Sequence, residues 1–177
     1  MLYYKKVTSP LGDITLRSDG EALTGLWFAD DKHYGAKDIA GAALADLDVF
    51  MQAEAWLAEY FAGREPKVSV PLKLQGSEFQ MQVWRLLQDI PYGRLVTYGD
   101  IAKKIAAQKG VARMSAQAVG GAVGHNPLCI IVPCHRVVGA NGSLTGYGGG
   151  MWRKVRLLEL EKVDISKLTV PTKGTAL

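Results

Sequence analysis

The chain has 177 residues, which is enough for one domain of ordinary size or for two small ones. A hydrophobic fraction of 48% with 21% charged residues is typical of a soluble globular protein, and no run of 18 apolar residues predicts a membrane-spanning helix. The net charge of +4 is divided unevenly, because residues 1–75 carry 8 basic and 11 acidic side chains whereas residues 76–177 carry 13 and 6.

Residues 1–75 are predicted to form a small sheet domain with one helix. The start of the chain lacks the apolar core of a signal peptide, so we expect a cytoplasmic protein, or a nuclear one in a eukaryote. Apolar residues at helical spacing predict a helix near residues 44–61, which Gly63 can end, and residues 65–76 resemble a linker. Before that helix, three β-rich runs separated by turn signals predict an antiparallel meander: residues 2–8, 14–18 and 22–28.

Residues 76–177 are predicted to form a second, mainly helical domain, so the expected fold class is mixed α/β, of the α+β type. Ser77 and Gln80 have capping-box spacing at the start of an amphipathic helix, which Pro91-Tyr92-Gly93 ends. The basic excess of this half favours a polyanionic partner, nucleic acid first, although surface charge without any partner gives the same imbalance. The tail from about residue 166 is expected to be flexible.

Two further helices are predicted in the middle of this domain. Thr97 and Asp100 form a second capping-box pattern for a helix that reaches about Ala107, and Ser115 can cap a third helix over residues 116–124. Two short helices joined by a glycine-containing turn are typical of a helix-turn-helix. An ordinary helical corner has the same spacing, so the pattern alone leaves both interpretations open.

The third of these helices, Ala116 to Gly124, consists almost entirely of small residues. Its two adjacent glycines, Gly120 and Gly121, each weaken a helix interior by roughly 1 kcal/mol relative to alanine. Close approach to another backbone is the usual reason for such residues. That neighbour is either another helix of the protein or a DNA minor groove, which is only about 6 Å wide.

The segment from Asn126 to Gly139 predicts a buried apolar strand that runs into Pro133-Cys134-His135-Arg136. A thiol beside a histidine and an arginine lies in positive surroundings, which favour the thiolate. Because neighbouring residues of a strand face opposite sides, His135 can serve Cys134 only if the chain turns there, with Pro133 as the candidate bend. A single cysteine is usually a small buried hydrophobe, but this combination indicates a reactive thiol.

The other cysteine, Cys129, lies in the same short run as Cys134. A disulfide between them would close a tiny loop within a strand, which is poor geometry, so we expect two reduced thiols in a reducing compartment. Two cysteines and three scattered histidines do not predict a structural zinc site.

The run Pro133-Cys134-His135-Arg136-Val137 resembles the active-site motif of the O6-alkylguanine-DNA alkyltransferases, the methylated-DNA–protein-cysteine methyltransferases. Residues 1–75 resemble the ribonuclease H-like N-terminal domain of that family only loosely. The cysteine motif is highly specific, and further matching segments follow the family's order: Phe79, Gln82-Val83-Trp84, Pro91-Tyr92-Gly93, Val96-Thr97-Tyr98, Ala118-Val119-Gly120, Asn126-Pro127, Gly146-Tyr147 and Glu161.

The resemblance implies a DNA-repair protein that reverses the damage directly. An alkyl group would move irreversibly from O6-alkylguanine in duplex DNA to Cys134, once per molecule and after flipping of the nucleotide. Whether O4-alkylthymine is also a substrate stays open. The implied partner is double-stranded DNA containing alkylated guanine, bound by a monomer without cofactor, metal or membrane.

The resemblance also assigns the catalytic roles. Cys134, His135 and Glu161 would form a relay with a water molecule, in which a carboxylate orients the base that accepts the thiol proton. Tyr98 would donate a proton to N3 of the leaving guanine. Asn126 would brace the turn between the DNA-binding helices and the active-site strand, and Arg136 would support the site.

Substrate and DNA contacts follow from the same resemblance. The backbones of Cys134 and Val137 and the N–H of Gly148 would read the guanine edge and its O6, while Tyr147 lines the pocket. The residues assigned to DNA binding lie at the starts of the second and third helices and along the third: Thr97, Ser115, Ala116, Gln117, Ala118, Gly120 and Gly121.

Two positions depart from the family pattern. Gln117 stands where an arginine often fills the gap left by the flipped base, so a hydrogen-bonding group remains but the charge is lost. Cys129 stands where proline is common, and is either simply buried or a second alkylation target. Three other functions stay in competition: a non-catalytic protein that binds alkyl lesions, a methyl-sensing regulator, and a Cys-His hydrolase.

Overall fold

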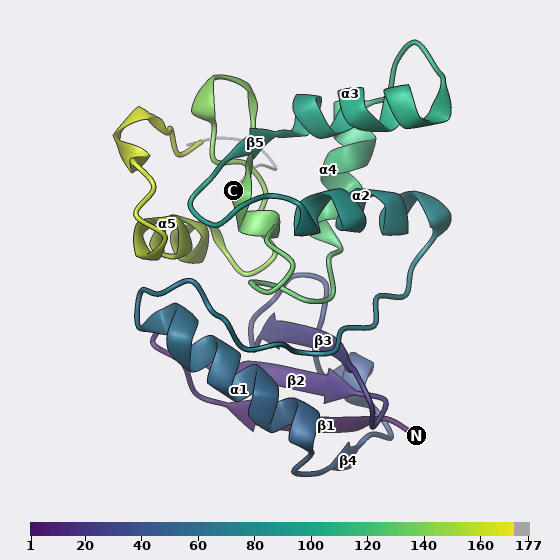
Figure 1. Ribbon diagram of the computed structural model, residues 1–177, viewed down its shortest axis with the longest axis vertical. Helices are drawn as coiled ribbons and strands as arrows, with labels where there is room; N and C mark the ends of the chain where they lie inside the picture. Colours follow the sequence, from purple (N-terminus) through teal and green to yellow (C-terminus); the bar gives the residue numbers. More distant parts are fainter. Residues whose placement is uncertain (172–177) are drawn as a thin grey trace. The chain divides into compact units, whose positions relative to one another are not determined.

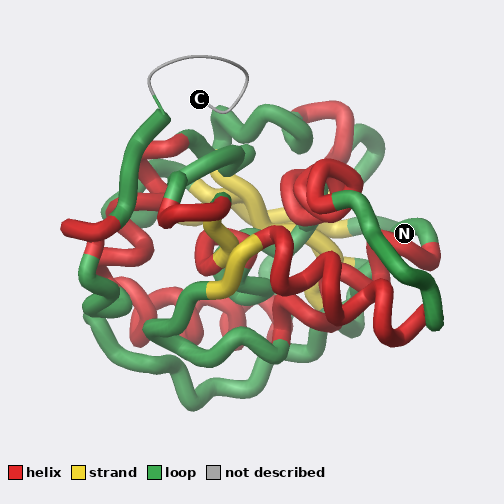
Figure 2. The backbone as a smooth tube through the Cα atoms, turned by 90° about the horizontal axis from the view of Figure 1, so that it is seen from above, coloured by secondary structure: helices red, strands yellow, loops and turns green. Residues whose placement is uncertain are grey.

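The computed structural model describes residues 1–171 and divides the chain into two compact units. Unit 1 contains residues 1–75 together with Pro127–Cys129, and unit 2 contains residues 76–126 and the chain from Ile130 onward. Unit 1 holds a sheet and a helix and unit 2 is mainly helical, so the predicted mixed α/β class is confirmed. Figure 2 shows the strands as a small share of a chain that consists mostly of helices and loops.

Unit 1 is built on a four-stranded sheet with the order β3-β2-β1-β4 (Figure 1). β1 (Tyr3–Val7), β2 (Ile14–Ser18) and β3 (Leu23–Phe28) form the predicted antiparallel meander. β4 (Ala43–Leu44) pairs with β1 in parallel and was not predicted, because two residues are too few to show an alternating pattern.

The core of unit 1 lies between this sheet and α1 (Asp48–Phe61). Ile14 is paired with Phe28 across β2 and β3, and both side chains are fully buried. On α1 the buried side chains recur at helical spacing: Val49, Phe50, Ala53, Leu57 and Tyr60. Phe50 and Leu57 are two of the apolar residues whose spacing predicts the helix, whereas a third, Met51, is exposed. Gly63 follows with φ of 80°, the left-handed conformation with which helices commonly end.

Two passing segments cover the free edge of β3. The Leu23 N–H donates to the Pro71 carbonyl at 2.8 Å, so the predicted linker is paired with the sheet at this point. Further along the strand, the Leu26 N–H donates to the Pro127 carbonyl at 2.8 Å and the Cys129 N–H donates to the Leu26 carbonyl at 3.0 Å. An edge covered in this way cannot pair with another chain.

Unit 2 contains α2 (Glu78–Gln88), α3 (Tyr98–Lys109), α4 (Ala116–Gly124) and α5 (Met151–Leu160). All three predicted N-caps are present, because the side chains of Ser77, Thr97 and Ser115 accept from backbone N–H groups of the first turns. The buried indole of Trp84 donates to the Ala122 carbonyl at 2.8 Å and ties α2 to α4. None of the helices in residues 1–171 is both long and apolar enough to cross a membrane.

The predicted buried strand that runs into Pro133-Cys134-His135-Arg136 is wrong. Leu128 makes only an isolated bridge with Leu26, and Ile130 turns the chain with φ of 71°, which is rare for a β-branched residue. The apolar run is buried but does not form a strand. A short apolar run has no periodicity, so its pattern cannot distinguish a buried strand from other buried chain. The chain becomes extended only at β6 (Val137–Val138), which pairs in parallel with β5 (Val96–Thr97).

The C-terminal segment is structured as far as it is described. Ile165–Lys167 form a short 3₁₀ helix, one of four in the described chain with Ala36–Ile39, Cys134–Arg136 and Ala140–Gly142. Thr169 exchanges backbone hydrogen bonds with Gly142 and Leu144. The rest of the tail that we expected to be flexible from about residue 166, residues 172–177, lies outside the described chain.

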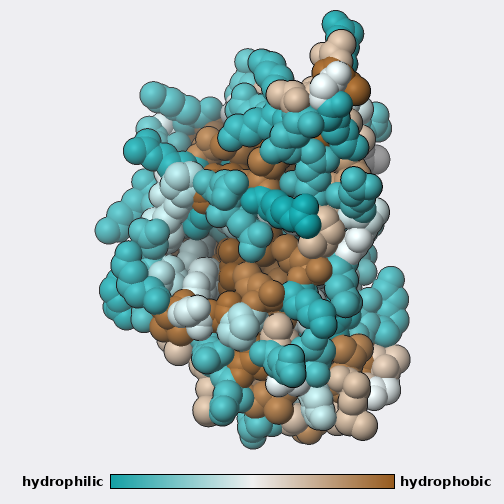
Figure 3. Space-filling view, turned by 45° about the vertical axis from the view of Figure 1, so that its right-hand side comes forward, coloured by the Kyte–Doolittle hydropathy of each residue, from teal (hydrophilic) through white to brown (hydrophobic). Residues whose placement is uncertain are grey.

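The described surface exposes few large apolar side chains. Hydrophilic residues cover most of the face shown in Figure 3, and apolar residues are gathered in restricted areas of it. The exposed large apolar residues are scattered along the chain: Met1, Leu2, Leu44, Met51, Val111, Trp152 and Val170.

Candidate active site

The chain turns sharply at Pro133, where the sequence required a bend. The Cys134 N–H donates to the Val132 carbonyl at 2.8 Å across Pro133, whose φ of −83° and ψ of 66° are those of an inverse γ-turn. A 3₁₀ helix over Cys134–Arg136 follows directly. Cys134 and His135 are therefore not held on opposite faces of a strand.

Asn126 fixes the approach to this turn. Its side-chain amide donates to the Val132 carbonyl at 2.8 Å, and both residues are buried. Asn126 follows α4 by two residues, so the amide links the end of that helix to the residue just before Pro133. The resemblance assigns Asn126 a bracing role, and this hydrogen bond shows one segment that its side chain holds.

Glu161 joins three segments of unit 2. One oxygen of its carboxylate lies 2.5 Å from His135 Nε2, and the other accepts from Arg136 Nε at 2.7 Å and from the Gly93 N–H at 2.9 Å. The Arg136 guanidinium also donates to the Ile90 carbonyl at 2.7 Å. Glu161 is 3% exposed and His135 is 0% exposed, so water does not screen these contacts.

The surroundings fix the protonation of this pair. Burial alone would raise the pKa of Glu161, but the hydrogen bonds and charges of His135 and Arg136 outweigh it and lower that pKa to about 2. Burial lowers the pKa of His135 below its usual value, with Glu161 opposing the shift. The carboxylate is therefore ionised and the imidazole neutral at pH 7. Because a carboxylate only accepts, Nε2 carries the ring proton and Nδ1 the basic lone pair.

Tyr98, at the start of α3, is held in its protonated form. Burial raises its pKa to about 12, with Cys134 contributing in the same direction, although the hydrogen bond to Thr145 opposes the shift. The phenol donates to the Thr145 carbonyl at 2.8 Å. A phenol that keeps its proton across the physiological range can donate it to a strongly basic group nearby.

The sequence did not single out two buried cations on α5, Arg153 and Lys154. Lys154 Nζ donates to the Val137 carbonyl at 2.6 Å and to the Thr145 carbonyl at 2.9 Å, and Arg153 donates to the Gly149 carbonyl at 2.7 Å. The sequence offers one indication that these two residues are buried. They lie on the same face of α5 as Leu157 and Leu158, and a lysine is unusual on a buried face.

The remaining predicted substrate residues lie around this network. The Val137 carbonyl already accepts from Lys154 and has a second lone pair for another donor. Tyr147 is buried and Gly148 is half-buried, both on the loop before α5. The hydrogen bonds of Lys154 and Thr145 thus connect Tyr98, Val137 and this loop, and the charge of Cys134 affects the pKa values of Lys154 and Tyr98.

The small residues of α4 form an exposed helix face. A Cβ placed on Gly121 would meet no atom within 4 Å, and one placed on Gly120 would make only ordinary contact with the Tyr98 ring at 3.9 Å. Packing within the described chain therefore does not require either glycine. The exposed residues at the start of α4 and along this face are among those assigned to DNA binding by the family resemblance: Ser115, Ala116, Gln117, Ala118 and Gly121. Thr97 is half-buried and serves as the cap of α3.

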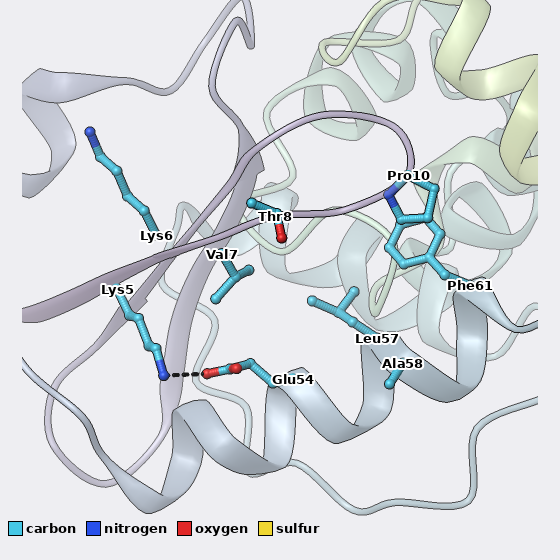
Figure 4. A pocket seen from close by; sticks show the side chains of 9 residues that line it. All are labelled: Lys5, Lys6, Val7, Thr8, Pro10, Glu54, Leu57, Ala58 and Phe61. Atoms are coloured by element: carbon cyan, nitrogen blue, oxygen red, sulfur yellow. Dashed lines mark ion pairs between the residues drawn. The ribbon is translucent and has the colours of Figure 1, made fainter.

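A separate hollow of about 470 Å³ lies in unit 1 between β1 and α1 (Figure 4). Lys5 pairs there with Glu54 at 2.6 Å and with Asp46 at 2.8 Å, while Lys6 points away from the helix. Its lining contains neither cysteine and none of the predicted site residues: Lys5, Lys6, Val7, Thr8, Pro10, Glu54, Leu57, Ala58 and Phe61. Cys129, also in unit 1, is buried and reduced.

Two family profiles match the chain and together cover most of it. The ribonuclease-like domain of 6-O-methylguanine DNA methyltransferase matches residues 2–74, and the DNA binding domain of the same family matches residues 78–163. Among curated proteins, the methylated-DNA–protein-cysteine methyltransferase of Mycobacterium tuberculosis is 46% identical over 162 residues, 92% of this chain and 93% of the relative. The protein of that name from Haemophilus influenzae is 41% identical over 97% of this chain and 93% of its own.

Solved structures agree. The crystal structure of the Mycobacterium tuberculosis O6-methylguanine methyltransferase has a TM-score of 0.78 at 43% identity, covering 98% of this chain and 97% of that one. The structure of Mycobacterium tuberculosis OGT in complex with DNA has a TM-score of 0.77 at 46% identity, covering 90% and 92%. The similarity thus spans both units.

Proposed function

The chain belongs to the methylated-DNA–protein-cysteine methyltransferase family, and we propose that it repairs alkylated guanine in duplex DNA by accepting the alkyl group on Cys134, once per molecule. The observation that carries this proposal is the buried relay behind the cysteine. Glu161, held ionised by Arg136, orients a neutral His135 that directly follows Cys134 on the 3₁₀ turn. Such an arrangement activates a thiol as a nucleophile.

The proposed reaction is an in-line displacement. His135 takes the thiol proton, and the Cys134 sulfur attacks the alkyl carbon on O6. The new S–C bond forms as the C–O bond breaks, and the electron pair of that bond stays on the guanine. Tyr98 then gives its phenol proton to N3, so the proton gained by His135 balances the proton lost by Tyr98. An imidazole and a carboxylate do not cleave the resulting thioether, so we expect one transfer per molecule.

DNA must present the base to this site. The O6 of a paired guanine lies on the edge that pairs with cytosine, and Cys134 is only 5% exposed, so the nucleotide has to be flipped out of the stack to reach the sulfur, at a cost of a few kcal/mol. The small, exposed face of α4 supports entry into the minor groove, because packing within residues 1–171 requires neither Gly120 nor Gly121. Gln117 is exposed on this face and would hydrogen-bond the orphaned cytosine without adding a charge.

Two finer points complete the proposal. All catalytic residues come from one unit of one chain, which supports action as a monomer. A thiol that must stay reduced fits a reducing compartment, such as the cytoplasm. We propose O6-alkylguanine as the main substrate and treat O4-alkylthymine as a second substrate to be assayed in parallel.

The proposal is tested by intact-mass measurement after incubation with duplex DNA that contains one O6-methylguanine. We expect the protein to gain one methyl group on Cys134 and DNA to be converted in a one-to-one ratio. Cys129→Ala, which removes the other thiol, should behave like the wild type, whereas Cys134→Ala should gain nothing. Lesion binding without any gain of mass would instead identify a non-catalytic lesion-binding protein, and repeated turnover would identify a hydrolase.

A further inference from the structure

Lys154 is a buried cation to which the proposed reaction assigns no role. Its side chain is 0% exposed, which is rare for lysine, and its two hydrogen bonds go to the backbone carbonyls of Val137 and Thr145. Removing an ammonium group from water is strongly unfavourable, and carbonyl dipoles compensate for it only in part. A buried lysine of this kind therefore calls for a reason beyond packing.

The groups around Lys154 are those on which charge changes during transfer. Its Nζ lies 5.9 Å from the centre of the Tyr98 ring, and the Tyr98 hydroxyl and Lys154 Nζ donate to the same Thr145 carbonyl, at 2.8 and 2.9 Å. Negative charge on Cys134 favours the charged form of Lys154. His135 feels the same cation, which disfavours its protonation.

Lys154 and its neighbour also hold the loop that precedes α5. Lys154 binds the carbonyl of Thr145 at one end of this loop, and Arg153 binds the carbonyl of Gly149 at the other. Tyr147 and Gly148 lie between these two anchors. Arg153 therefore shares the clamping role, but it donates to the Gly149 carbonyl, whereas Lys154 donates to the Thr145 carbonyl that Tyr98 uses.

We propose that Lys154 is a positioning residue for alkyl transfer, which fixes the Val137 and Thr145 carbonyls and keeps a positive charge beside the sulfur and the phenol. During the displacement, negative charge moves from the Cys134 sulfur to the guanine while Tyr98 gives up its proton. A fixed cation in a low-dielectric site stabilises that charge without reorganising at the moment of reaction. The inference rests on the proposed function, because it assigns the charge movement to that reaction.

The proposal has a consequence at alkaline pH. Burial lowers the pKa of Lys154 to about 8, so the ammonium form is lost just above neutrality. The titratable groups that face it are Cys134, His135 and Tyr98, and Tyr98 keeps its proton to higher pH because its own pKa is raised to about 12. The transfer rate should therefore fall above about pH 8, before the phenol ionises.

Two substitutions separate charge from clamping. Lys154→Gln retains amide N–H donors for the two carbonyls but removes the charge, whereas Lys154→Met removes both. Arg153→Met is the matched control, because it removes the neighbouring buried cation of the same helix and the anchor at the far end of the loop. All three are made in the Cys129→Ala background, so that only one thiol reacts.

The first measurement is the rate at which iodoacetamide alkylates Cys134 as a function of pH. The second is single-turnover methyl transfer from O6-methylguanine DNA over the same pH range, with folding checked by circular dichroism. We expect Lys154→Gln and Lys154→Met to shift the thiol titration to higher pH by about one unit and to slow transfer at pH 7 by about tenfold, the rate equivalent of such a shift. The alkaline fall near pH 8 should disappear in both, and Arg153→Met should leave the thiol titration unchanged.

A purely structural lysine gives a different pattern. If Lys154→Gln folds with an unshifted thiol titration and wild-type transfer, or keeps the fall near pH 8, the inference is wrong. Lys154→Gln decides the matter even where Lys154→Met fails to fold. Absence of transfer in the wild type itself would instead overturn the proposed function, while the iodoacetamide titration would still report on Lys154.

Discussion

The two units bury different kinds of side chain. In the described part of unit 1, the buried polar side chains are the hydroxyls of Thr15, Ser18 and Thr24, and its ion pairs, such as that of Lys73 with Asp19, lie at the surface. Unit 2 instead buries charged or titratable groups: His135, Arg136, Arg153, Lys154 and Glu161. The same chain thus builds one unit from apolar packing and another around interior charge.

This difference indicates where function is located. Exposed ion pairs contribute little to stability, because water and salt screen them. Buried charges are unfavourable unless partners satisfy them, so a cluster of them is retained for chemistry more often than for stability. Matched substitutions in the two units can test this interpretation, since similar changes should affect transfer in unit 2 and leave it unchanged in unit 1.

The largest effect is expected from Glu161→Gln. The neutral amide leaves the Arg136 charge uncompensated and no longer holds His135 in its reactive tautomer, so transfer should slow by about 100-fold or more. Breaking a buried ion pair should also lower the free energy of unfolding by about 3–5 kcal/mol. Single-turnover transfer and urea unfolding measure the two effects.

The pH dependence provides a check on this variant. The pKa of Glu161 is lowered to about 2, so its carboxylate stabilises the fold above the unfolded value of 4.5, and that contribution is lost as pH falls from 4.5 through 2. The wild type should therefore lose its advantage over Glu161→Gln across this window. Glu54→Gln, at the half-exposed ion pair of unit 1, should leave transfer unchanged, and equal rate losses in both variants would contradict the comparison.

Tyr98→Phe is expected to have the next largest effect. Loss of a proton donor to the leaving base should slow transfer by roughly 100-fold, at the lower end of the range for general acids. DNA affinity should change little, because the ring is retained. Tyr34→Phe is the matched control in unit 1, where burial also raises a tyrosine pKa to about 12. Equal losses of rate and DNA affinity in Tyr98→Phe would argue against proton donation.

Local patterns allowed the sequence to predict much of the fold. The caps at Ser77, Thr97 and Ser115 depend on residues three positions apart, and the meander of β1 to β3 depends on alternation and turn residues, so both are readable along the chain. The resemblance to the family supplied Cys134, His135 and Glu161 as candidates, and the structure brings the last two into contact.

Long-range pairing accounts for what the sequence could not predict. The parallel pairing of β5 with β6 joins segments 41 positions apart in the register Val96 to Val137, and nothing local marks either two-residue strand. The supposed strand before Cys134 was an apolar run whose burial comes from its neighbours in space. Lys154 was missed for a similar reason, because its two acceptors lie 17 and 9 residues away along the chain.

A pair of glycine substitutions tests the two units by packing instead of charge. In Gly25→Ala on β3, the new Cβ would lie 2.3 Å from a ring atom of Trp27, which is itself buried. The ring must move, so we expect a loss of about 1–3 kcal/mol in the free energy of unfolding. Transfer by the folded fraction should be unchanged. A stable variant that transfers slowly would show that unit 1 contributes to the chemistry.

Gly121→Ala on α4 should have the smallest effect and the opposite sign on stability. The added methyl meets no atom within 4 Å, and alanine favours a helix by up to about 1 kcal/mol, so unfolding should become slightly harder. If this face enters the minor groove, the methyl should weaken DNA binding by a few-fold, about 1 kcal/mol. Fluorescence anisotropy at fixed salt measures the affinity.

Gly35→Ala, where a Cβ also meets nothing and the backbone is extended, is the matched control in unit 1. Unchanged affinity in Gly121→Ala would remove this face of α4 from the DNA interface, and lower stability would restore the tight-packing explanation for its glycines.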